Sequence, residues 1–187
     1  RLGARAWPRD LRVVELFCGR GNGLRALERL GFRHVEGVDR SAALLAHYQG
    51  PARLVDADCR ALPFESASRD LIVIHGGLHH LPQLPEDLAH TLDEAHRVLR
   101  ATGRIALVEP WQTPFLRFVH AVSLRPWIAR WWDKLDAFAT MTRYEADTYF
   151  AWLAAPDPIR AALVERFEPL VCDVRWGKLH FLGQRRS

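Results

Sequence analysis

Three glycines at alternating positions, Gly19, Gly21 and Gly23, form the part of the sequence best suited to hold a ligand. They lie in VVELFCGRGNGLRAL, between an apolar run at 12–17 and a segment at 23–31 with helical periodicity. Such a loop lets the backbone approach a ligand closely, and the first turn of the helix offers free N–H groups. The sequence therefore predicts a nucleotide-like ligand at this loop.

The spacing of the glycines discriminates between nucleotide ligands. Dinucleotide-binding loops use G-x-G-x-x-G. Here the spacing is G-x-G-x-G, and Leu24 stands where the third glycine of the dinucleotide loop would be. The sequence also offers no arginine–lysine cradle for a pyrophosphate. Both observations argue against a dinucleotide and against a dehydrogenase.

Carboxylates follow at the ends of the next two strand-like segments. Asp39 ends the segment at 34–39, where a carboxylate can bind both hydroxyls of a ribose. Asp58 ends the segment at 52–58 and can accept a hydrogen bond from an adenine amino group. Glu15 adds negative charge beside the glycine loop. Together these residues favour a nucleoside with a short, zwitterionic and partly cationic tail.

The elements that must position these residues alternate along the chain. Strand-like segments are expected at 12–17, 34–39, 52–58, 69–75 and 103–110, and helices at 23–31, 41–49 and 86–100. This alternation predicts an α/β fold with a doubly wound, mostly parallel sheet and helices on both faces. Ligands of such folds bind outside the carboxyl ends of the strands.

The C-terminal part follows a different pattern. The pattern at 169–186 predicts two strands that meet in a hairpin at Gly177. The segment before them, at 158–167, is predicted to be a crossover helix. The aromatic-rich segment at 111–157 is interpreted as a helical cap over the strand ends. Its aromatic side chains serve either the core or a substrate pocket. We expect residues 1–187 to form a single domain that carries this cap.

The ordered motifs resemble those of the class I S-adenosylmethionine-dependent methyltransferases. The matching segments are VVELFCGRGNG, GVDRS, DADCRALPF, DLIVIHGGLHHL and EAHRVLRATGRIALVEP. The chain is most similar to the small-molecule branch with the ubiquinone/menaquinone-type enzymes (methyltransferase type 11). The resemblance implies a seven-stranded Rossmann-like sheet with an antiparallel last strand. It also implies S-adenosylmethionine as cofactor and S-adenosylhomocysteine as its product.

The resemblance assigns the methionine end of the cofactor to the glycine loop. Glu15, Gly19, Gly21 and Gly23 would surround the methionine part, and His75, at the end of the fourth strand, would lie near the sulfonium.

The resemblance assigns the adenosine to the next two strand ends. Asp39 would bind the ribose, with Arg40 beside the adenine. Asp58 and the backbone of Cys59 would hold the adenine. The sequence departs from the family at RATGRI, which replaces the usual Lys-Pro-Gly-Gly turn. It also has only eleven residues before the first strand, where the family often has a helix that helps cover the cofactor. Either the chain is truncated, or the segment at 111–157 does all the covering.

Histidines offer the remaining candidates for chemistry. HGGLHHL groups His75, His79 and His80, but no carboxylate or cysteine nearby completes a metal site, and we predict none. His79 is interpreted either as a general base near the transferred methyl or as a structural residue, and His80 as structural. His120, in the cap, faces either the substrate or an apolar packing site. His79 and His120 are the tentative catalytic residues.

The amino-acid composition argues against membrane, secreted and disulfide-rich classes of protein. The 187 residues are 49% hydrophobic and 26% charged, which is ordinary for a globular domain. No apolar run approaches the roughly 20 residues of a membrane helix, and RLGARAWPRD has no signal-peptide pattern. Three widely spaced cysteines argue against a disulfide framework. We expect a cytoplasmic protein with no membrane partner.

The expected reaction is an SN2 transfer of the methyl group of S-adenosylmethionine to a small-molecule acceptor. Amino-group methyltransferases of nucleic acids carry an Asn/Asp-Pro-Pro-aromatic segment after the fourth strand, where this sequence has HGGL. The net charge of +4 is scattered, so no nucleic-acid partner is expected. A non-catalytic module of the same fold, which binds S-adenosylmethionine or a partner enzyme, is the alternative. The sequence determines neither the acceptor nor the oligomeric state.

Overall fold

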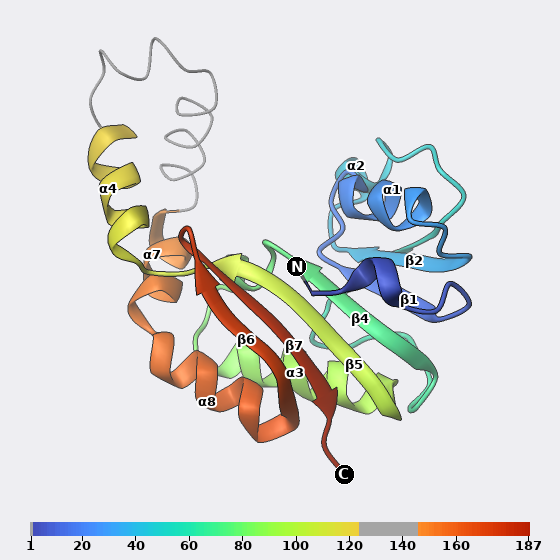
Figure 1. Ribbon diagram of the computed structural model, residues 1–187. Helices are drawn as coiled ribbons and strands as arrows, with labels where there is room; N and C mark the ends of the chain where they lie inside the picture. The colour runs from blue at the N-terminus through green and yellow to red at the C-terminus, as the bar shows by residue number, and fades with distance from the viewer. Residues whose placement is uncertain (1, 124–145) are drawn as a thin grey trace.

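The computed structural model describes residues 2–123 and 146–187 and contains a seven-stranded sheet in the order β3-β2-β1-β4-β5-β7-β6 (Figure 1). The strands are β1 (Arg12–Leu16), β2 (His34–Asp39), β3 (Arg53–Asp56), β4 (Arg69–His75), β5 (Leu99–Pro110), β6 (Phe167–Arg175) and β7 (Lys178–Arg185). Strands β1 to β5 pair in parallel, and β7 runs antiparallel between β5 and β6. The predicted doubly wound sheet with an antiparallel C-terminal hairpin is confirmed.

Helices cover both faces of this sheet. They are α1 (Asn22–Arg29), α2 (Ala42–Leu45), α3 (Glu86–Val98), α4 (Pro114–Ser123), α7 (Ala146–Ala154) and α8 (Pro156–Arg166), with short 3₁₀ helices η1 (Ala4–Ala6) and η2 (Leu78–His80). Figure 1 shows α1 and α2 on one face and α3 and α8 on the other.

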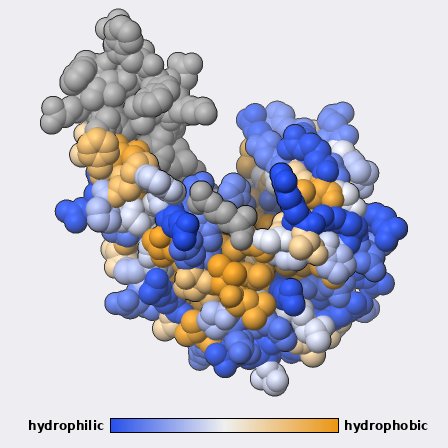
Figure 2. Space-filling model, in the orientation of Figure 1, coloured by the Kyte–Doolittle hydropathy of each residue, from blue (hydrophilic) through white to orange (hydrophobic). Residues whose placement is uncertain are grey.

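Alternating side chains of each strand divide the core between the two faces. Val14 and Ile72 pack in the cluster that includes Leu88 and Leu92 of α3, whereas Val13 packs in the cluster that includes α1. The two faces are covered unequally. Among residues 2–123 and 146–187, Figure 1 shows no helix over β5 and β7 on the α1 face, and Figure 2 shows apolar surface there.

Several predicted boundaries are wrong. Strand β3 ends at Asp56 rather than at 58, so Asp58 lies two residues beyond the strand. Strand β5 begins at Leu99 rather than at 103, because fully buried Leu99 pairs with Arg69 at the start of β4. Helix α2 ends at Leu45 rather than near 49. The chain turns there so that Tyr48 packs into the core and its hydroxyl accepts a hydrogen bond from the amide of Ala52 at 3.0 Å.

The C-terminal hairpin turns at Trp176 and Gly177, which both have positive φ angles of 52° and 73°. This two-residue turn suits the twist of antiparallel strands and confirms the predicted turn at Gly177. The cap expected at 111–157 is described at 111–123 and 146–157, where it contains α4 and α7. The aromatic residues between these helices, Trp127, Trp131, Trp132, Phe138 and Tyr144, lie outside the described residues.

Candidate functional site

Most of the site residues predicted from the sequence line one of two cavities. The strand-end cavity, of about 200 Å³, lies at the carboxyl ends of β1, β2 and β3. The sheet-face cavity, of about 500 Å³, lies between the N-terminal segment, α1 and the adjoining face of β4, β5 and β7. Asp39, Arg40, Asp58 and Cys59 line the strand-end cavity. The sheet-face cavity is lined at one end by Glu15, Gly23 and His75.

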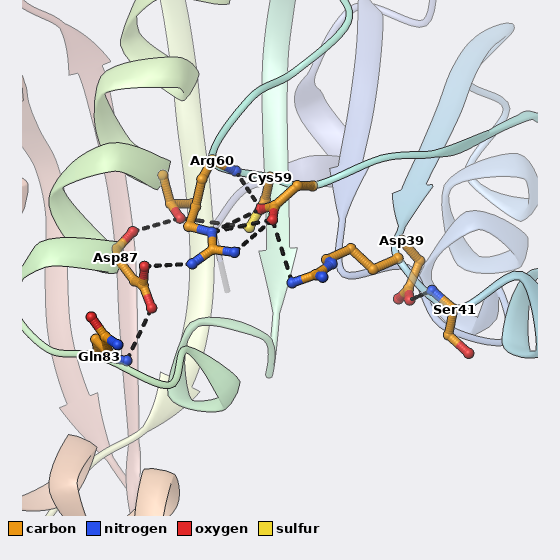
Figure 3. Close-up of polar contacts among 9 residues, drawn as sticks. Asp39, Ser41, Cys59, Arg60, Gln83 and Asp87 are labelled. Carbon is orange, nitrogen blue, oxygen red and sulfur yellow. Dashed lines mark hydrogen bonds and ion pairs between the residues drawn. The ribbon is translucent and has the colours of Figure 1, made fainter.

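Asp39 is held in place by two backbone amides. The N–H of Gly19 donates to Oδ2 at 2.8 Å, and the N–H of Ser41 donates to Oδ1 at 2.9 Å. Figure 3 shows the carboxylate beside Ser41 at the end of β2. Each oxygen therefore has lone-pair capacity left for a hydroxyl donor, since a carboxylate accepts about four hydrogen bonds. This geometry suits a ribose diol.

Asp58 also lines the strand-end cavity, and the guanidinium of Arg60 binds its carboxylate. The guanidinium donates from Nε to Oδ1 at 3.0 Å and from Nη2 to Oδ2 at 2.7 Å. Its third nitrogen reaches Asp87 of α3 at 2.6 Å. These hydrogen bonds lower the pKa of Asp58 to about 2, so the carboxyl is ionised at neutral pH. Arg60 thus fixes the carboxylate while it occupies much of its accepting capacity.

The other two residues predicted at the adenine also line this cavity. The guanidinium of Arg40 is mostly exposed and lies 3.4 Å from Asp58. Cys59 is buried, and its thiol contacts the hydroxyl of Thr91 at 3.5 Å. Burial raises the pKa of Cys59 to about 11, so the thiol is neutral. Cys59 therefore offers a small apolar wall and its backbone to a ligand.

Glu15 is a buried carboxyl group with one unsatisfied oxygen. Its side chain is on β1, only 3% of the residue is exposed, and the backbone of Leu24 hydrogen-bonds to it. Its Oε2 atom has no hydrogen-bond partner. Burial raises the pKa of Glu15 to about 8, so the free protein holds it protonated at neutral pH. A cation that reaches this carboxyl would favour its ionised form.

The glycines make room for the protein's own side chains as well as for a ligand. A Cβ on Gly23 would lie 1.8 Å from Oε1 of Glu15, and a Cβ on Gly21 would lie 2.3 Å from the ring of Tyr48. Gly21 also has a φ of 76° at the N-cap of α1. Gly19 has a positive φ of 50° and donates its amide to Asp39. All three positions therefore require glycine for distinct reasons.

His75 ends β4 at the sheet-face cavity. Partial desolvation of its imidazole lowers the pKa, and the nearby charge of Lys178 lowers it further. The ring is therefore neutral at neutral pH. His75 shares this cavity with Glu15 and Gly23, whereas Asp39 and Asp58 line the other cavity.

His79 and His120 converge on Tyr149 of α7, although they are far apart in the sequence. The ring of His79 lies 5.7 Å from that of Tyr149, and Nε2 of His120 lies 3.2 Å from its hydroxyl. Tyr149 is only 1% exposed, and burial raises its pKa to about 12. Neither histidine lines the strand-end or the sheet-face cavity. Their proposed catalytic role stays a prediction.

Among the described residues, no group of three or more His, Cys, Asp or Glu side chains is arranged to hold a metal ion. None of the helices in 2–123 and 146–187 is long and apolar enough to cross a membrane.

The class of the protein follows from a comparison with known families. The Methyltransf_11 family, described as a methyltransferase domain, matches residues 14–107, which run from β1 into β5. The chain belongs to this methyltransferase family. Membership implies that the methyltransferase uses S-adenosylmethionine, in agreement with the resemblance of its motifs.

A curated relative covers only part of this methyltransferase. It is the ubiquinone/menaquinone biosynthesis C-methyltransferase UbiE of Rhizobium etli, 34% identical over 73 residues. The match covers 39% of this chain and 27% of the relative. The match thus spans about a quarter of the curated relative.

Solved structures share the fold of this methyltransferase over nearly its whole length. The PH0226 protein of Pyrococcus horikoshii aligns with a TM-score of 0.67 at 17% identity, over 95% of this chain and 82% of that chain. An S-adenosylmethionine-dependent methyltransferase of Mesorhizobium loti aligns with a TM-score of 0.65 at 19% identity, over 98% and 96% of the two chains. A putative methyltransferase of Haloferax volcanii, solved with its Trm112 activator, aligns at 0.65 and 16% identity, over 98% and 88%.

Phe17 is a residue of the methyltransferase loop that the sequence analysis missed. It follows β1, has a positive φ of 58° and lines the strand-end cavity. Its ring occupies the space that a Cβ on Gly77 would need, at 2.4 Å. A bulky residue in the left-handed region is strained, so surrounding contacts must hold it. In the sequence, an aromatic residue just before closely spaced glycines could have indicated this role.

Glu109 of the methyltransferase was also missed. It is completely buried at the end of β5, and its Oε1 accepts the amides of Gly77 and Leu78 at 2.8 and 3.0 Å. Its Oε2 lies 2.8 Å from Nδ1 of His79. Glu109 therefore fixes both the loop after β4 and the orientation of that imidazole. A glutamate that ends an apolar strand was the signal in the sequence.

Proposed function

We propose that S-adenosylmethionine binds with its adenosine in the strand-end cavity and its methionine end beside Glu15. The methyl group then passes to a small-molecule acceptor, and S-adenosylhomocysteine is the product. This proposal rests mainly on two carboxylates that line one cavity beside the glycine loop: Asp39, at the end of β2, and Asp58, two residues after the end of β3. The family supports the cofactor, while the residue assignments are inferred from chemistry.

The polar groups fit each part of such a ligand. The oxygens of Asp39 retain capacity for the ribose hydroxyls after the amides of Gly19 and Ser41 are counted. Oε2 of Glu15 is buried without a partner, so an ammonium group would satisfy it. The adenine would lie between Phe17 and Cys59, where the edge of Asp58 left free by Arg60 could accept its amino group.

The bound cofactor supplies an electrophilic methyl group on a positively charged sulfur. The chain must then align the acceptor with that methyl group and exclude water. Asp39 and Glu15 anchor the two ends of the ligand, so the reactive part between them is held beside the glycine loop. His75, at the end of β4, forms part of the wall of this region.

A general base is required only for some acceptors. An acidic group such as a carboxylic acid or phenol is readily ionised and needs little help, whereas an alcohol or amine needs a base. His79, oriented by Glu109, and His120 are the candidates for that base. Because neither lines the two cavities, the geometry favours an acceptor that is already anionic.

The extent of the functional unit is part of the proposal. Residues 1–187 form one methyltransferase domain, in which 111–157 acts as a cap near the strand ends. Helix α7 packs against η2, the turn that follows β4, which supports this placement. Trp152 of α7 donates its indole N–H to the carbonyl of Pro110 at 2.8 Å and so ties the cap to β5.

Titration calorimetry with S-adenosylhomocysteine tests the proposed cofactor site. We expect the chain to bind it, and Asp39→Ala to weaken binding at least tenfold, because the ribose loses charge-assisted hydrogen bonds. Asp56→Ala is the matched control, since Asp56 is exposed and lies outside the cavity. Equal affinity in wild type and Asp39→Ala would contradict the site. Binding without turnover across a panel of acids, phenols and amines would favour the non-catalytic alternative.

A further inference from the structure

The sheet-face cavity is larger than the methionine end of the cofactor requires. It has a volume of about 500 Å³, and Glu15 and Gly23 occupy only one part of its wall. We propose that the rest of this cavity binds the methyl acceptor, and that the acceptor is a carboxylic acid on an apolar body. This inference rests on the proposed cofactor site, because the cofactor must present its methyl group where the two regions meet.

The wall of the cavity selects an apolar body. Three elements supply it: the N-terminal segment with Trp7, helix α1 with Leu27 and Leu30, and the sheet with Val73 and Ala106. Cavities of this size with mostly apolar walls bury most of a small organic ligand. Of the helices in the described part of the chain, Figure 1 shows none over β5 and β7 on this face of the sheet.

Polar groups gather at the end of the cavity nearest the carboxyl ends of β4 and β5. His75 pairs with Val108, and Val108 pairs with His180, so the three residues form one row across β4, β5 and β7. Lys178 lies two residues before His180 and also lines the cavity. Its ammonium is close enough to His75 to lower the pKa of that imidazole.

This arrangement suits a carboxylate. Lys178 supplies a positive charge, and His75 supplies a ring N–H that can donate to an anionic oxygen. Within the described residues, Lys178 has no ion-pair partner, so its charge is available to a ligand. Glu15 is on β1, the neighbour of β4, and pairs with Val73, two residues before His75. The cofactor's cationic groups are proposed to lie on this side.

The proposed methyl transfer to a carboxylate needs no proton acceptor. An oxygen of the ionised carboxylate forms a bond to the methyl carbon. The bond between that carbon and sulfur breaks, and its electron pair stays on sulfur. The products are a neutral methyl ester and S-adenosylhomocysteine. One negative and one positive charge are lost together, so no general base is needed. This agrees with the absence of His79 and His120 from the cavity walls.

Calorimetry with a matched pair of probes tests the inference without turnover. 2-Naphthoate and 2-naphthalenemethanol share one apolar body and differ in the anionic group. We expect 2-naphthoate to bind at least tenfold more tightly, and Lys178→Glu to remove that preference. Arg29→Glu is the control, because it makes the same charge change on the exposed side of α1. Equal binding of the two probes, or no effect of Lys178→Glu, would overturn the proposal.

A second pair of variants tests whether the probe lies in this cavity. Ala26 lines the cavity on α1, whereas Ala43 is exposed on α2. Ala26→Phe should therefore weaken naphthoate at least tenfold, and Ala43→Phe should not. Similar affinity in both would place the probe elsewhere and overturn the assignment.

A final titration separates this inference from the proposed function. Naphthoate should still bind when S-adenosylhomocysteine is saturating, because the two ligands occupy neighbouring regions. Mutual exclusion would mean that the cavity belongs to the cofactor alone and would overturn the acceptor proposal, while the cofactor site stands. Failure of S-adenosylhomocysteine to bind at all would instead contradict the proposed function.

Discussion

The strand-end cavity and the sheet-face cavity would offer a ligand different kinds of wall. The smaller one is bordered by charged side chains that are already fixed, such as Asp39 between two amides and Asp58 on Arg60. The larger one has mostly apolar walls with a few polar groups at one end. A fixed polar site requires one arrangement of donors, whereas an apolar wall mainly limits size and shape.

Glu15 and Gly23 line the sheet-face cavity, at the proposed boundary between the cofactor and the acceptor. The carboxyl of Glu15 is buried, protonated in the free protein and short of one hydrogen bond. This costs stability that a bound cation would restore. The difference between the cavities therefore suggests that the fold is prepared for its cofactor at this boundary, and that the acceptor fills the remaining apolar space.

The largest expected effect comes from the contact between Gly23 and Glu15. Gly23→Ala places a Cβ 1.8 Å from Oε1 of Glu15, so we expect a loss of about 3 kcal/mol in the free energy of unfolding. The same change in a Glu15→Ala background should cost much less, because the carboxylate is gone and alanine favours helix. Urea denaturation of the four proteins measures this coupling. Additive losses would mean that the two residues do not share this space.

The second effect is the pH dependence that Glu15 imposes. Its pKa is raised from 4.5 to about 8 in the folded state. Between these values the folded protein holds a proton that the unfolded chain releases, so stability falls as pH rises. Relative to Glu15→Gln, wild type should lose about 2 kcal/mol of unfolding free energy between pH 5 and pH 7. Parallel pH profiles in urea would show that Glu15 is not protonated in the folded protein.

The smallest effect concerns Phe17, in the wall of the strand-end cavity. Phe17→Gly and Phe17→Ala both remove the ring, and both should weaken S-adenosylhomocysteine about tenfold, or about 1.4 kcal/mol. Phe17→Gly should be about 1 kcal/mol more stable than Phe17→Ala, because the backbone has a φ of 58°. Calorimetry and thermal denaturation measure the two effects. Unchanged affinity in both variants would remove Phe17 from the ligand wall.

The sequence predicted the fold and the polar site better than the apolar cavity, for physical reasons. β2 and β4 have the predicted bounds because their apolar runs end at Asp39 and His75, where pairing stops. Asp39 and Asp58 were found because parallel strands bring their carboxyl ends to one edge. The start of β5 was misplaced, since Leu99 pairs with Arg69 across a register shift, with extra residues in β5 before Arg104, that no local pattern reveals.

The contacts that define the second cavity are all long-range. Gly23 was read as part of a ligand cradle, yet its missing side chain makes room for Glu15 on another element. Lys178 and His75 are about a hundred positions apart and meet only through the order of β4, β5 and β7. Glu109 was hidden in an apolar strand. Such neighbours become visible once strand order and register are known.

One cofactor is proposed to bridge the two regions, with its nucleoside at Asp39 and its ammonium group at Glu15. Calorimetry with adenosine and with S-adenosylhomocysteine, on wild type, Asp39→Ala and Glu15→Gln, tests this directly. Asp39→Ala should weaken both ligands at least tenfold. Glu15→Gln should weaken S-adenosylhomocysteine by a similar factor and leave adenosine unchanged. If Glu15→Gln affects both ligands equally, or neither, the claim is contradicted.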